Sequence, residues 1–377
     1  MEDFLKIEIA GEEAEHVYCD LVLLEVEIDE ELASMFRMQL TLNRDGGDWT
    51  YLDDAEIRPW QEISISAGLA DDNDLLLSGY ITQIKPIFGS DLQSAVIEIM
   101  GMDKSVAMDR MEILKDWPDK SDSDIAEAIF AKYGLEPDVE ATDVVHSEET
   151  STIIQRDTDI QFLRRLALRN GYECYVQGDT GVFKSLDLDS PSQGVLAVHF
   201  GEETNTYGFT LELDALMPTG VAMQQIDRLN KTTSSVAIET SDIKVLGAQE
   251  AASLLGEKTI PEDGTPIGKG LRYIGQNSAF GEAEMEALSQ GLFQKSEWLI
   301  RASGEVNSAE YGKVVQARKL ITVKGIGETY SGEFYVCRVK HLFTLGGYTQ
   351  YVTLKRNAIE LTGDEQFSED AGLALPF

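Results

Sequence analysis

The residues best suited to catalysis or metal binding are few and widely spaced in this sequence. The four histidines show no HExxH or HxH spacing that would place two imidazoles on one metal ion. The three cysteines lack a CxxC pair, which favours reduced thiols over a disulfide frame. No GxSxG nucleophile motif occurs. The sequence therefore predicts no catalytic residue, no metal site and no cofactor. The residues concerned are His16, His146, His199, His341, Cys19, Cys174 and Cys337.

A glycine-rich segment at residues 264–270 has a superficial likeness to a phosphate-binding loop. Its first two glycines, Gly264 and Gly268, enclose three residues where that loop needs four. Gly270 stands where a serine or threonine would bind magnesium. Nucleotide binding is therefore not expected.

The charge balance is the outlier of the composition, with 67 acidic and 31 basic residues and a net charge of −36. Such a surface repels nucleic acid, so no direct nucleic-acid binding is expected. Two interpretations stay open: the charge serves solubility, or it lines a channel through which acidic cargo slides. The abundance of carboxylates does not by itself indicate a glycosidase, which needs two carboxyls at a defined separation.

Targeting signals are also not evident. No run of about 18 apolar residues predicts a membrane span. The first residues lack a basic region followed by an apolar one, so no signal peptide is expected and assembly in the cytoplasm is predicted.

The N-terminal third has the period-two pattern of β-strands. Val22, Leu24, Val26 and Ile28 are expected on one face of a strand. Residues 36–42 alternate in the same way, and turn-rich segments separate further short strands. Residues 1–110 are therefore predicted to form an antiparallel β unit.

Helical patterns follow between residues 111 and 195. Ser121 to Asp124 offers helix caps, with Ile125, Ala128 and Ile129 expected on one buried face. Thr158 and Gln161 have the spacing of a capping box, and Gly171 fits the left-handed end of that helix. A hairpin around residues 178–181 completes a predicted α+β unit.

The remaining sequence returns to β patterns. Residues 196–245 and 301–362 are predicted to form a second β unit, interrupted by a segment at 246–300. That segment is expected to hold a linker with little regular structure and a long helix over 282–300, whose apolar side includes Leu299. Residues 363–377 form an acidic tail. The predicted fold class is mainly β with an α+β insertion.

Three segments carry a resemblance to a known family. Residues 155–172 (QRDTDIQFLRRLALRNGY) resemble a segment of the late control protein D family of phage tails, which also occurs in the hub part of type VI secretion VgrG proteins. Residues 79–84 with 101–103 resemble that family's first β domain, and residues 330–358 resemble its closing signature. The signature positions are Gly79, Gly101, Asp103, Asp159, Phe162, Leu163, Arg165, Leu166, Gly332, Tyr335, His341, Gly347, Tyr348 and Arg356.

The resemblance implies a structural baseplate hub rather than an enzyme. Each subunit of such a hub contributes two β-barrel tube domains, so a homotrimer forms a ring with six-fold pseudosymmetry. The implied partners are a separate trimeric spike, a hexameric inner tube or tube-initiator protein, and baseplate wedge proteins. The particle is a contractile phage tail or a contractile injection system.

Two other functions stay open at this point. A tail-tip hydrolase acting on peptidoglycan or glycan needs a cleft with a perturbed carboxylate pair. A monomeric adhesin-like β protein needs no assembly at all.

Overall fold

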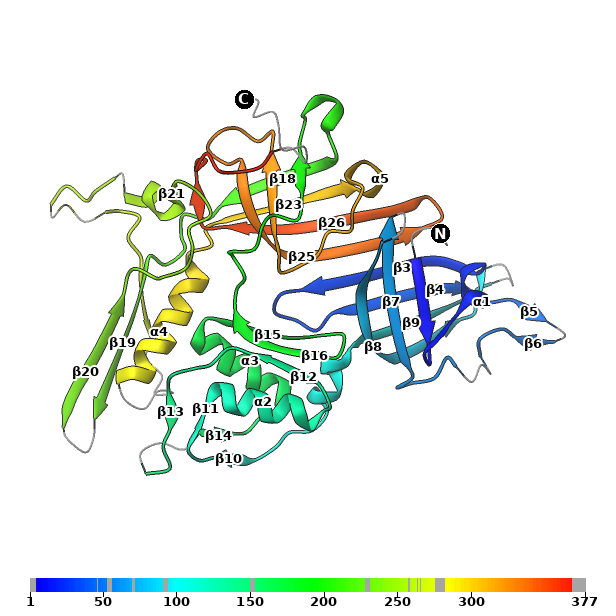
Figure 1. The fold of residues 1–377 in the computed structure, drawn as a ribbon, viewed down its shortest axis with the longest axis horizontal. Helices are drawn as coiled ribbons and strands as arrows, with labels where there is room; N and C mark the ends of the chain where they lie inside the picture. The colour runs from blue at the N-terminus through cyan, green and yellow to red at the C-terminus, as the bar shows by residue number, and fades with distance from the viewer. Residues whose placement is uncertain are drawn as a thin grey trace.

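The computed structural model describes residues 5–45, 47–52, 56–69, 72–90, 94–149, 153–227, 231–256, 258–262, 264, 266–274 and 282–367. Figure 1 shows two β units side by side, with a helical unit below them and a three-stranded sheet projecting at one end. The mainly β fold class with helical insertions is confirmed.

The first β unit contains six main strands that pair in the order β1, β7, β8, β9, β4, β3. Their bounds are β1 (Leu5–Ile9), β3 (Leu21–Asp29), β4 (Met35–Thr41), β7 (Glu62–Leu69), β8 (Asp72–Ile87) and β9 (Val96–Asp103). The short helix α1 (Glu15–Tyr18) lies between β1 and β3, and its Tyr18 hydroxyl accepts a hydrogen bond from the Ile7 amide at 2.9 Å. Short strands β2 (Glu12–Glu13), β5 (Arg44–Asp45) and β6 (Asp48–Trp49) decorate its edge.

The predicted alternation in this unit is right for β4 and wrong for the start of β3. Phe36, Met38 and Leu40 are fully buried in the core of the unit. Val22, expected on the buried face of β3, is 36 % exposed. A bulge between Leu21 and Leu23 shifts the register there, so Val22 leaves the face that Leu24 and Val26 share.

The second β unit also has six main strands, which pair in the order β17, β24, β25, β26, β23, β18. Their bounds are β17 (Val195–Ala197), β18 (Thr206–Leu213), β23 (Ile300–Asn307), β24 (Leu320–Lys324), β25 (Gly332–Thr344) and β26 (Gly347–Arg356). A bridge between Val198 and Thr206 connects β17 to β18 and closes the strands into a ring. The helical turns η3 (Gly201–Glu203) and α5 (Ser308–Tyr311) and the strand β27 (Ala358–Ile359) flank it.

The two β units repeat one strand order. When the strands of each unit are numbered from one to six along the chain, both units pair as 1-4-5-6-3-2. The units differ in their first pair, because β1 runs antiparallel to β7 whereas β17 runs parallel to β24. The duplication for which the sequence shows no residue-level repeat is therefore present at the level of topology.

The two units share one continuous sheet. Strand β25 pairs with β3 over Arg338 to Thr344, which lie more than 300 residues from their partners in the sequence. Figure 1 shows β25 and β26 running beside β3 and β4 in this sheet. The chain therefore places its two β units in a fixed orientation through backbone hydrogen bonds.

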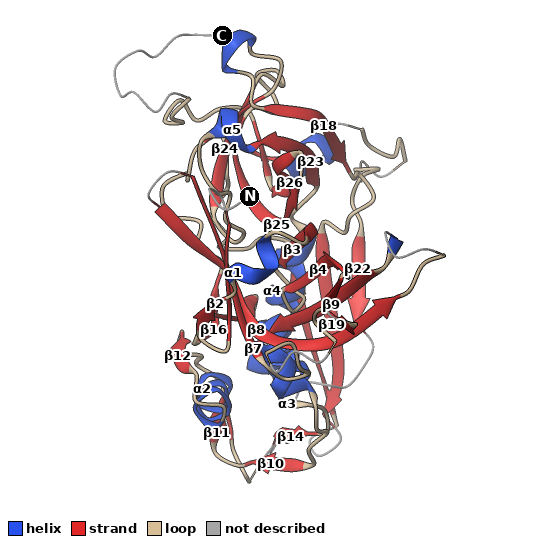
Figure 2. Ribbon diagram, turned by 90° about the vertical axis from the view of Figure 1, so that its right-hand side faces the viewer, coloured by secondary structure: helices blue, strands red, loops and turns tan. Residues whose placement is uncertain are grey.

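The helical unit is inserted between β9 and β17. A small core joins α2 (Asp122–Lys132) and α3 (Asp159–Asn170) to a sheet of β12 (Glu136–Val139), β16 (Thr180–Ser185) and β15 (Tyr172–Gln177). The turn η2 (Lys104–Asp109) enters it, and two-stranded ribbons pair β10 (Lys115–Trp117) with β14 (Ile153–Gln155) and β11 (Lys120–Ser121) with β13 (Val145–His146). In Figure 2 this unit lies at the opposite end of the molecule from α5.

Two details of the helical prediction are corrected. Ser121 caps α2, as expected, and forms a capping box with Asp124 that was not predicted. Ala128, expected in the core, is exposed, and Ala126 takes its place. Thr158 precedes α3 without a side-chain cap hydrogen bond, and its hydroxyl is turned toward Asp109 Oδ1, to which it donates at 2.6 Å. Gly171 adopts the expected left-handed conformation, with a φ of 69°.

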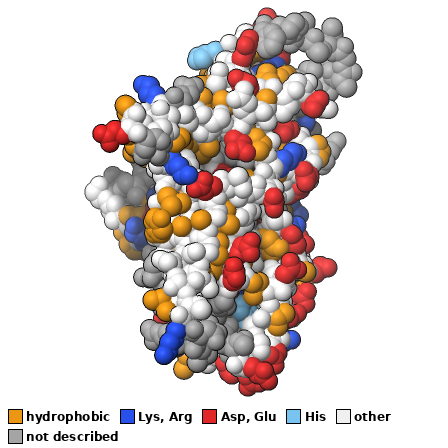
Figure 3. Space-filling view, turned by 90° about the vertical axis from the view of Figure 1, so that its left-hand side faces the viewer, with side chains coloured by type: hydrophobic (Ala, Val, Ile, Leu, Met, Phe, Trp, Pro, Cys, Tyr) orange, Lys and Arg blue, Asp and Glu red, His pale blue; other side chains and the backbone are white. Residues whose placement is uncertain are grey.

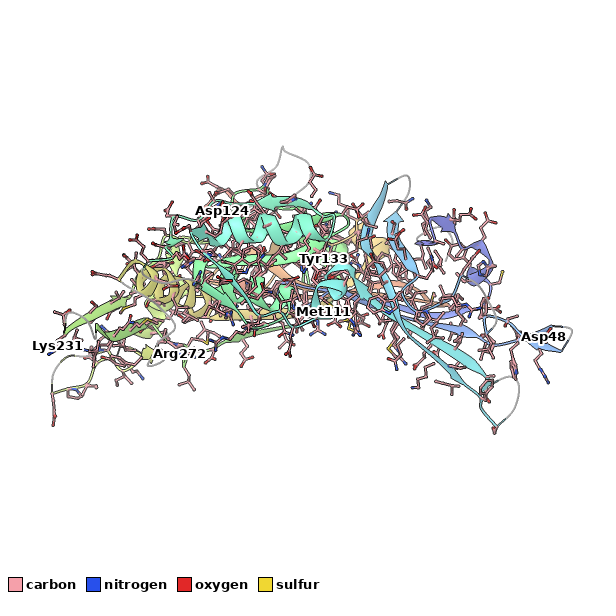
Figure 4. All side chains as sticks on the ribbon, turned by 90° about the horizontal axis from the view of Figure 1, so that it is seen from below. Asp48, Met111, Asp124, Tyr133, Lys231 and Arg272 are labelled. Atoms are coloured by element: carbon pink, nitrogen blue, oxygen red, sulfur yellow. The ribbon has the colours of Figure 1, made fainter. Side chains whose placement is uncertain are left out.

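A second insertion lies between β18 and β23. The strands β20 (Thr232–Ile238), β19 (Gly220–Asp227) and β22 (Leu271–Ile274) form a separate sheet against α4 (Glu282–Ser296). Residues 214–227 and 231–245 therefore do not join the ring of the second β unit. Figure 4 shows Lys231 and Arg272 of this insertion at the opposite end of the molecule from Asp48.

The interrupting segment also differs from the expectation. It contains β21 (Gln249–Glu250), η4 (Ala251–Gly256) and β22 where little regular structure was predicted. The long helix ends at Ser296, so Leu299 lies in the core of the second β unit rather than on α4. Of the acidic tail, residues 368–377 lie outside the described residues.

Candidate functional site

The most extensive feature common to both β units is the outward face of the sheet that they share. Cross-strand rows run over it from β23 to β9 without interruption. We call the outward residues of these rows the shared sheet face. The two longest rows are Glu305, Tyr351, Lys340, Glu27, Met35 and Met102, and Asn307, Thr349, Leu342, Glu25, Arg37 and Met100. The shorter rows add Ser303, Thr353, Arg338 and Asp29; Arg301, Lys355 and Tyr335; and Gly347, Thr344, Leu23, Gln39 and Glu98. Of these residues, Tyr335, Lys355 and Glu98 are buried by neighbouring side chains.

Ion pairs cross this face between neighbouring strands. Glu98 accepts from Arg37 and, at 3.2 Å, from Lys85, and these hydrogen bonds lower the pKa of Glu98. Arg37 also pairs with Glu25 at 3.5 Å. Lys340, from the other β unit, pairs with the same Glu25 at 3.4 Å. Because Lys340 lies on β25 and Glu25 on β3, this chain of charges crosses the junction between the units.

The charges of the shared sheet face are balanced. Five carboxylates and five cations lie in its rows: Glu25, Glu27, Asp29, Glu98 and Glu305, with Arg37, Arg301, Arg338, Lys340 and Lys355. The whole excess of 36 negative charges is therefore carried elsewhere on the chain. The face of the molecule in Figure 3 shows acidic side chains gathered along one side, with lysine and arginine scattered singly.

The signature positions of the first β unit lie where β8 crosses β9. A Cβ on Gly79 would stand 1.9 Å from the Met102 carbonyl oxygen, and one on Gly101 would stand 2.2 Å from that of Tyr80. Asp103 is buried and accepts from the amides of Ser34 at 2.5 Å and Ser105 at 2.9 Å. Burial raises the pKa of Asp103. These residues therefore fix the point at which the chain leaves the β unit for the helical insertion.

The signature positions of the α3 segment belong mainly to the helical core. Phe162, Leu163 and Leu166 are buried there, whereas Arg165 is exposed and pairs with Asp157. Asp159 is buried at the start of α3 and accepts from Lys132 at 2.5 Å, Gln155 at 2.7 Å and Tyr133 at 2.8 Å. Although burial opposes the shift, these hydrogen bonds lower the pKa of Asp159. The carboxylate is thus fully used in joining α2 to α3.

His341 and Tyr348 form a buried pair next to the junction of the β units. The His341 ring is fully buried, and its Nδ1 lies 2.8 Å from the Tyr348 hydroxyl. Burial lowers the pKa of His341 to about 3, so the ring is neutral at physiological pH. Tyr348 also stacks on Phe343 at 4.3 Å between ring centroids. Gly347, with a φ of 127°, makes the tight turn that brings Tyr348 back over β25.

Arg356 and Gly332 close one end of the second ring. Arg356 is fully buried and donates to four backbone carbonyls, of Leu246, Tyr330, Ser331 and Glu360, at 2.8–3.0 Å. A Cβ on Gly332 would stand 2.6 Å from Arg356 Nη2, so a side chain there would displace the guanidinium. Burial lowers the pKa of Arg356 to about 10. The residue therefore binds loops together as a structural cation.

Tyr335 connects the second β unit to the helical insertion. Its hydroxyl donates to Glu173 Oε1 on β15 at 2.6 Å. Burial, and the nearby Glu173 carboxylate, raise the pKa of Tyr335 well above its ordinary value. The signature positions thus lie at separate joints between units, and no single cleft gathers them.

Sequence reasoning missed one buried polar cluster. Asp122, His146, Arg169 and Glu284 come from α2, β13, α3 and α4 and are all buried. His146 Nε2 lies 3.0 Å from Asp122 Oδ1, and Arg169 donates to Glu284 at 2.7 Å. Although burial opposes the shift, hydrogen bonds from His146 and Arg169 lower the pKa of Asp122. The four residues are too far apart in sequence for any local pattern to have indicated this cluster.

Two features are absent from the described residues. In these ranges, no group of three or more His, Cys, Asp or Glu side chains is placed to hold a metal ion. None of the described helices is long and apolar enough to cross a membrane.

Comparison with protein families gives a match over most of the chain. The family model described as the Alg8 N-terminal domain matches residues 3–344. This model is not that of the late control protein D family, which the resemblance had led us to expect. No curated protein matches the chain in a sequence search.

Comparison of the fold with solved structures gives several tail proteins. A 43 kDa tail protein of prophage MuSo2 from Shewanella oneidensis has a TM-score of 0.64 at 14 % identity, over 95 % of this chain and 99 % of that one. A tail protein from Neisseria meningitidis MC58 has a TM-score of 0.65 at 12 % identity, over 94 % and 97 %. The E. coli c3393 protein, described as a component of the type VI secretion system, has a TM-score of 0.53 at 12 % identity, over 93 % and 76 %. The chain therefore belongs to the Alg8 N-terminal domain family and shares its fold with phage tail proteins and a type VI secretion component.

Proposed function

We propose that this chain is a structural hub that joins a hexameric inner tube to a trimeric spike in a contractile phage tail or contractile injection system. The observation that carries the proposal is the repeated strand order of two β units held in one sheet. Three such chains present six similar β units, which is the number needed to match a hexameric tube on one side and a trimeric spike on the other. The likeness of the fold to tail proteins supports this role.

The proposed hub has no enzymatic role and needs no cofactor. Its partners are two further copies of itself, a separate spike protein, a tube or tube-initiator protein and the baseplate wedge proteins. The resemblance to late control protein D and to VgrG hubs supports this set of partners.

We further propose that the shared sheet face lines the lumen of the ring. It is the surface that both β units build together, and its opposite side is closed by the two hydrophobic cores. A balanced set of paired charges gives such a lumen little net field, so that cargo of either sign passes without strong adsorption.

Light scattering on the chain mixed with its spike tests the oligomeric state. We expect a complex containing three copies of the 41.7 kDa chain for each spike trimer. A chain that stays monomeric in the presence of the spike would refute the hub.

Cysteine labelling of the assembled complex tests the lumen assignment. In a Cys19→Ser background, which removes the exposed native thiol, Gln39→Cys places a thiol on the shared sheet face and Ser66→Cys places one on the outside of β7. A maleimide carried on a bulky polymer should react with the second thiol and be excluded from the first. Equal reaction at both positions in the complex would contradict the assignment.

One observation favours a second candidate, a tail-tip cell-wall hydrolase. Glu173 and Glu31 line the same pocket, and their pKa values move in opposite directions: burial raises that of Glu173, whereas a hydrogen bond from Lys295 lowers that of Glu31. A general acid and a base need such a separation of pKa values. A zymogram on cell-wall substrate decides, because clearing that Glu173→Gln abolishes would establish the hydrolase.

A further inference from the structure

The strand order that the two β units repeat also identifies strands that have no neighbour in the single chain. Within the chain, the fifth strand of the second unit, β25, pairs with the second strand of the first unit, β3. The corresponding fifth and second strands are β8 of the first unit and β18 of the second. These two strands stand at opposite ends of the row β18-β23-β26-β25-β3-β4-β9-β8 (Figure 1), so they do not meet in one chain.

Strands β8 and β25 correspond in detail. Each carries a bulge against the strand that follows it, at Thr82 in β8 and at Cys337 in β25. In both strands the carbonyl just before the bulge accepts from the amide of a residue with positive φ, which is Trp60 in the first unit and Arg318 in the second. The residues that follow the two bulges therefore correspond one to one.

Strands β3 and β18 also correspond, and without a gap. Their neighbours β4 and β23 pair in the same register with β9 and β26, which sets Leu21–Asp29 against residues 206–214. The two sequences are LVLLEVEID and TYGFTLELD. Both are apolar at the fourth, sixth and eighth positions and acidic at the seventh and ninth.

The edges of β8 and β18 that correspond to this junction are open in the part of the chain that the structure describes. Strand β7 pairs with β8 only as far as Tyr80, so residues 82–87 have a partner strand on one side alone, which is β9. Strand β18 pairs with β23, and its other edge meets only Val198, through the bridge to Thr206. Unpaired edges of this kind are templates for another strand.

Equivalent side chains differ in burial at the internal junction and at the open edges. Phe343 and Val26, which meet where β25 pairs with β3, are 1 % and 0 % exposed. Their counterparts are Phe88, which follows β8 and is 57 % exposed, and Leu211 of β18, which is partly exposed. Apolar side chains left uncovered beside an unpaired edge indicate an interaction surface.

We propose that β8 of one subunit pairs antiparallel with β18 of a second copy of the chain, in the register that β25 and β3 use within the chain. This pairing rests on the proposed trimeric hub. Lys340 lies opposite Glu27 at the internal junction, and the same register places Lys85 opposite Glu212 between subunits. Opposite charges that face each other across two strands stabilise the pair. Each chain gives one edge and receives the other, which is a head-to-tail contact that closes into a ring of three.

Pro86 makes the pairing between subunits weaker than the pairing within the chain. The Cys337 carbonyl accepts from the Glu30 amide, so by alternation His341 also directs its backbone groups toward β3. Pro86 corresponds to His341 and has no amide hydrogen to donate, so one hydrogen bond is lost. Proline within a sheet is confined to edge strands, which agrees with the open edge of β8 in the single chain.

Disulfide cross-linking of the chain mixed with its spike tests the strand pair and its register. In a Cys19→Ser background, which removes the exposed native thiol, Lys85→Cys with Glu212→Cys places two thiols opposite each other across the subunit boundary. The same alternation makes this a non-hydrogen-bonded pair, with Cα atoms about 4.5 Å apart, which a disulfide can bridge. Oxidation should therefore yield covalent dimers and trimers on a non-reducing gel. Lys85→Cys with Thr210→Cys, displaced by two residues to about 7–8 Å, should cross-link about ten-fold less.

A charge swap tests the proposed ion pair independently of oxidation. Lys85→Glu should weaken assembly about ten-fold at low salt, and adding Glu212→Lys should restore it. Thermal melts of the separate subunits verify that the variants keep their fold. A chain that stays monomeric with its spike refutes the hub and this pairing together. A trimer that forms without the cross-link between residues 85 and 212, or that ignores the charge variants, refutes the pairing alone.

Discussion

Replacing Arg356 with methionine tests how the second β unit is held closed. The methionine side chain keeps much of the apolar stem and removes the guanidinium that donates to four buried backbone carbonyls. At about 1.5 kcal/mol for each carbonyl left without its donor, the loss is about 6 kcal/mol. The substitution also relieves the cost of burying a charge. Burial lowers the pKa of Arg356 from 12.5 to about 10, which corresponds to about 3 kcal/mol. The expected net loss of stability is therefore about 3 kcal/mol.

Arg338→Met is the matched control, because Arg338 lies on the neighbouring strand β25 but is exposed. Its pairing with Glu27 at 2.8 Å is a surface ion pair, worth about 0–1 kcal/mol. Denaturant unfolding and local hydrogen exchange compare the two variants, and Arg356→Met should also speed exchange near residues 246, 330 and 360. If Arg356→Met is no less stable than Arg338→Met, the four hydrogen bonds do not hold the ring together.

Three other substitutions give separate predictions. Leu163→Asp or Leu166→Asp should lower the free energy of unfolding by several kcal/mol, because an unpaired carboxylate is then buried in the helical core. Arg164→Ala should lower it by less than about 1 kcal/mol. Equal melting temperatures would contradict the placement of the two leucines on the buried face of α3. Burial raises the pKa of Glu297 to about 7, so its stabilising contribution is present below pH 4.5 and is lost as the pH rises through 7. Glu297→Gln should therefore melt at the same temperature as wild type at pH 4 and at a higher temperature at pH 8. The expected gain in free energy of unfolding at pH 8 is on the order of 1 kcal/mol for this partly exposed group. Gly101→Ala places a Cβ 2.2 Å from the Tyr80 carbonyl oxygen and should destabilise the fold strongly. Gly256→Ala is the control, because its Cβ meets nothing within 4 Å. Similar unfolding midpoints for the two variants would show that β8 and β9 can separate.

The sequence predicted features that depend on near neighbours. Phe36, Met38 and Leu40 alternate because one face of β4 is buried, and this pattern is visible within seven residues. Ser121 and Asp124 cap α2 through contacts three residues apart, which the sequence also shows. The mainly β class follows from many such short segments.

The failures share a physical cause, which is that the deciding partner is distant in the sequence. The bulge that exposes Val22 exists because β3 pairs with β4 in a shifted register. The Thr158 hydroxyl bonds to Asp109, 49 residues away, instead of capping α3. The pairing of β3 with β25, which creates the shared sheet face, has no local signal at all. The resemblance located signature positions such as Asp103 and Arg356, but only the structure shows that they lie at joints between units.

The distribution of charge bears on why the chain is so acidic. An acidic channel requires that the surface around the lumen carry a disproportionate share of the carboxylates. If the shared sheet face lines the lumen, as we propose, its five carboxylates are matched by five cations, and ion pairs such as Arg338 with Glu27 and Lys340 with Glu25 already cross it. The negative field then belongs to the exterior, where three chains repel one another less because water and salt screen charges beyond about 8 Å. On this placement the acidity serves solubility rather than the passage of cargo, and charge reversal of exterior carboxylates should reduce solubility while leaving the lumen unchanged.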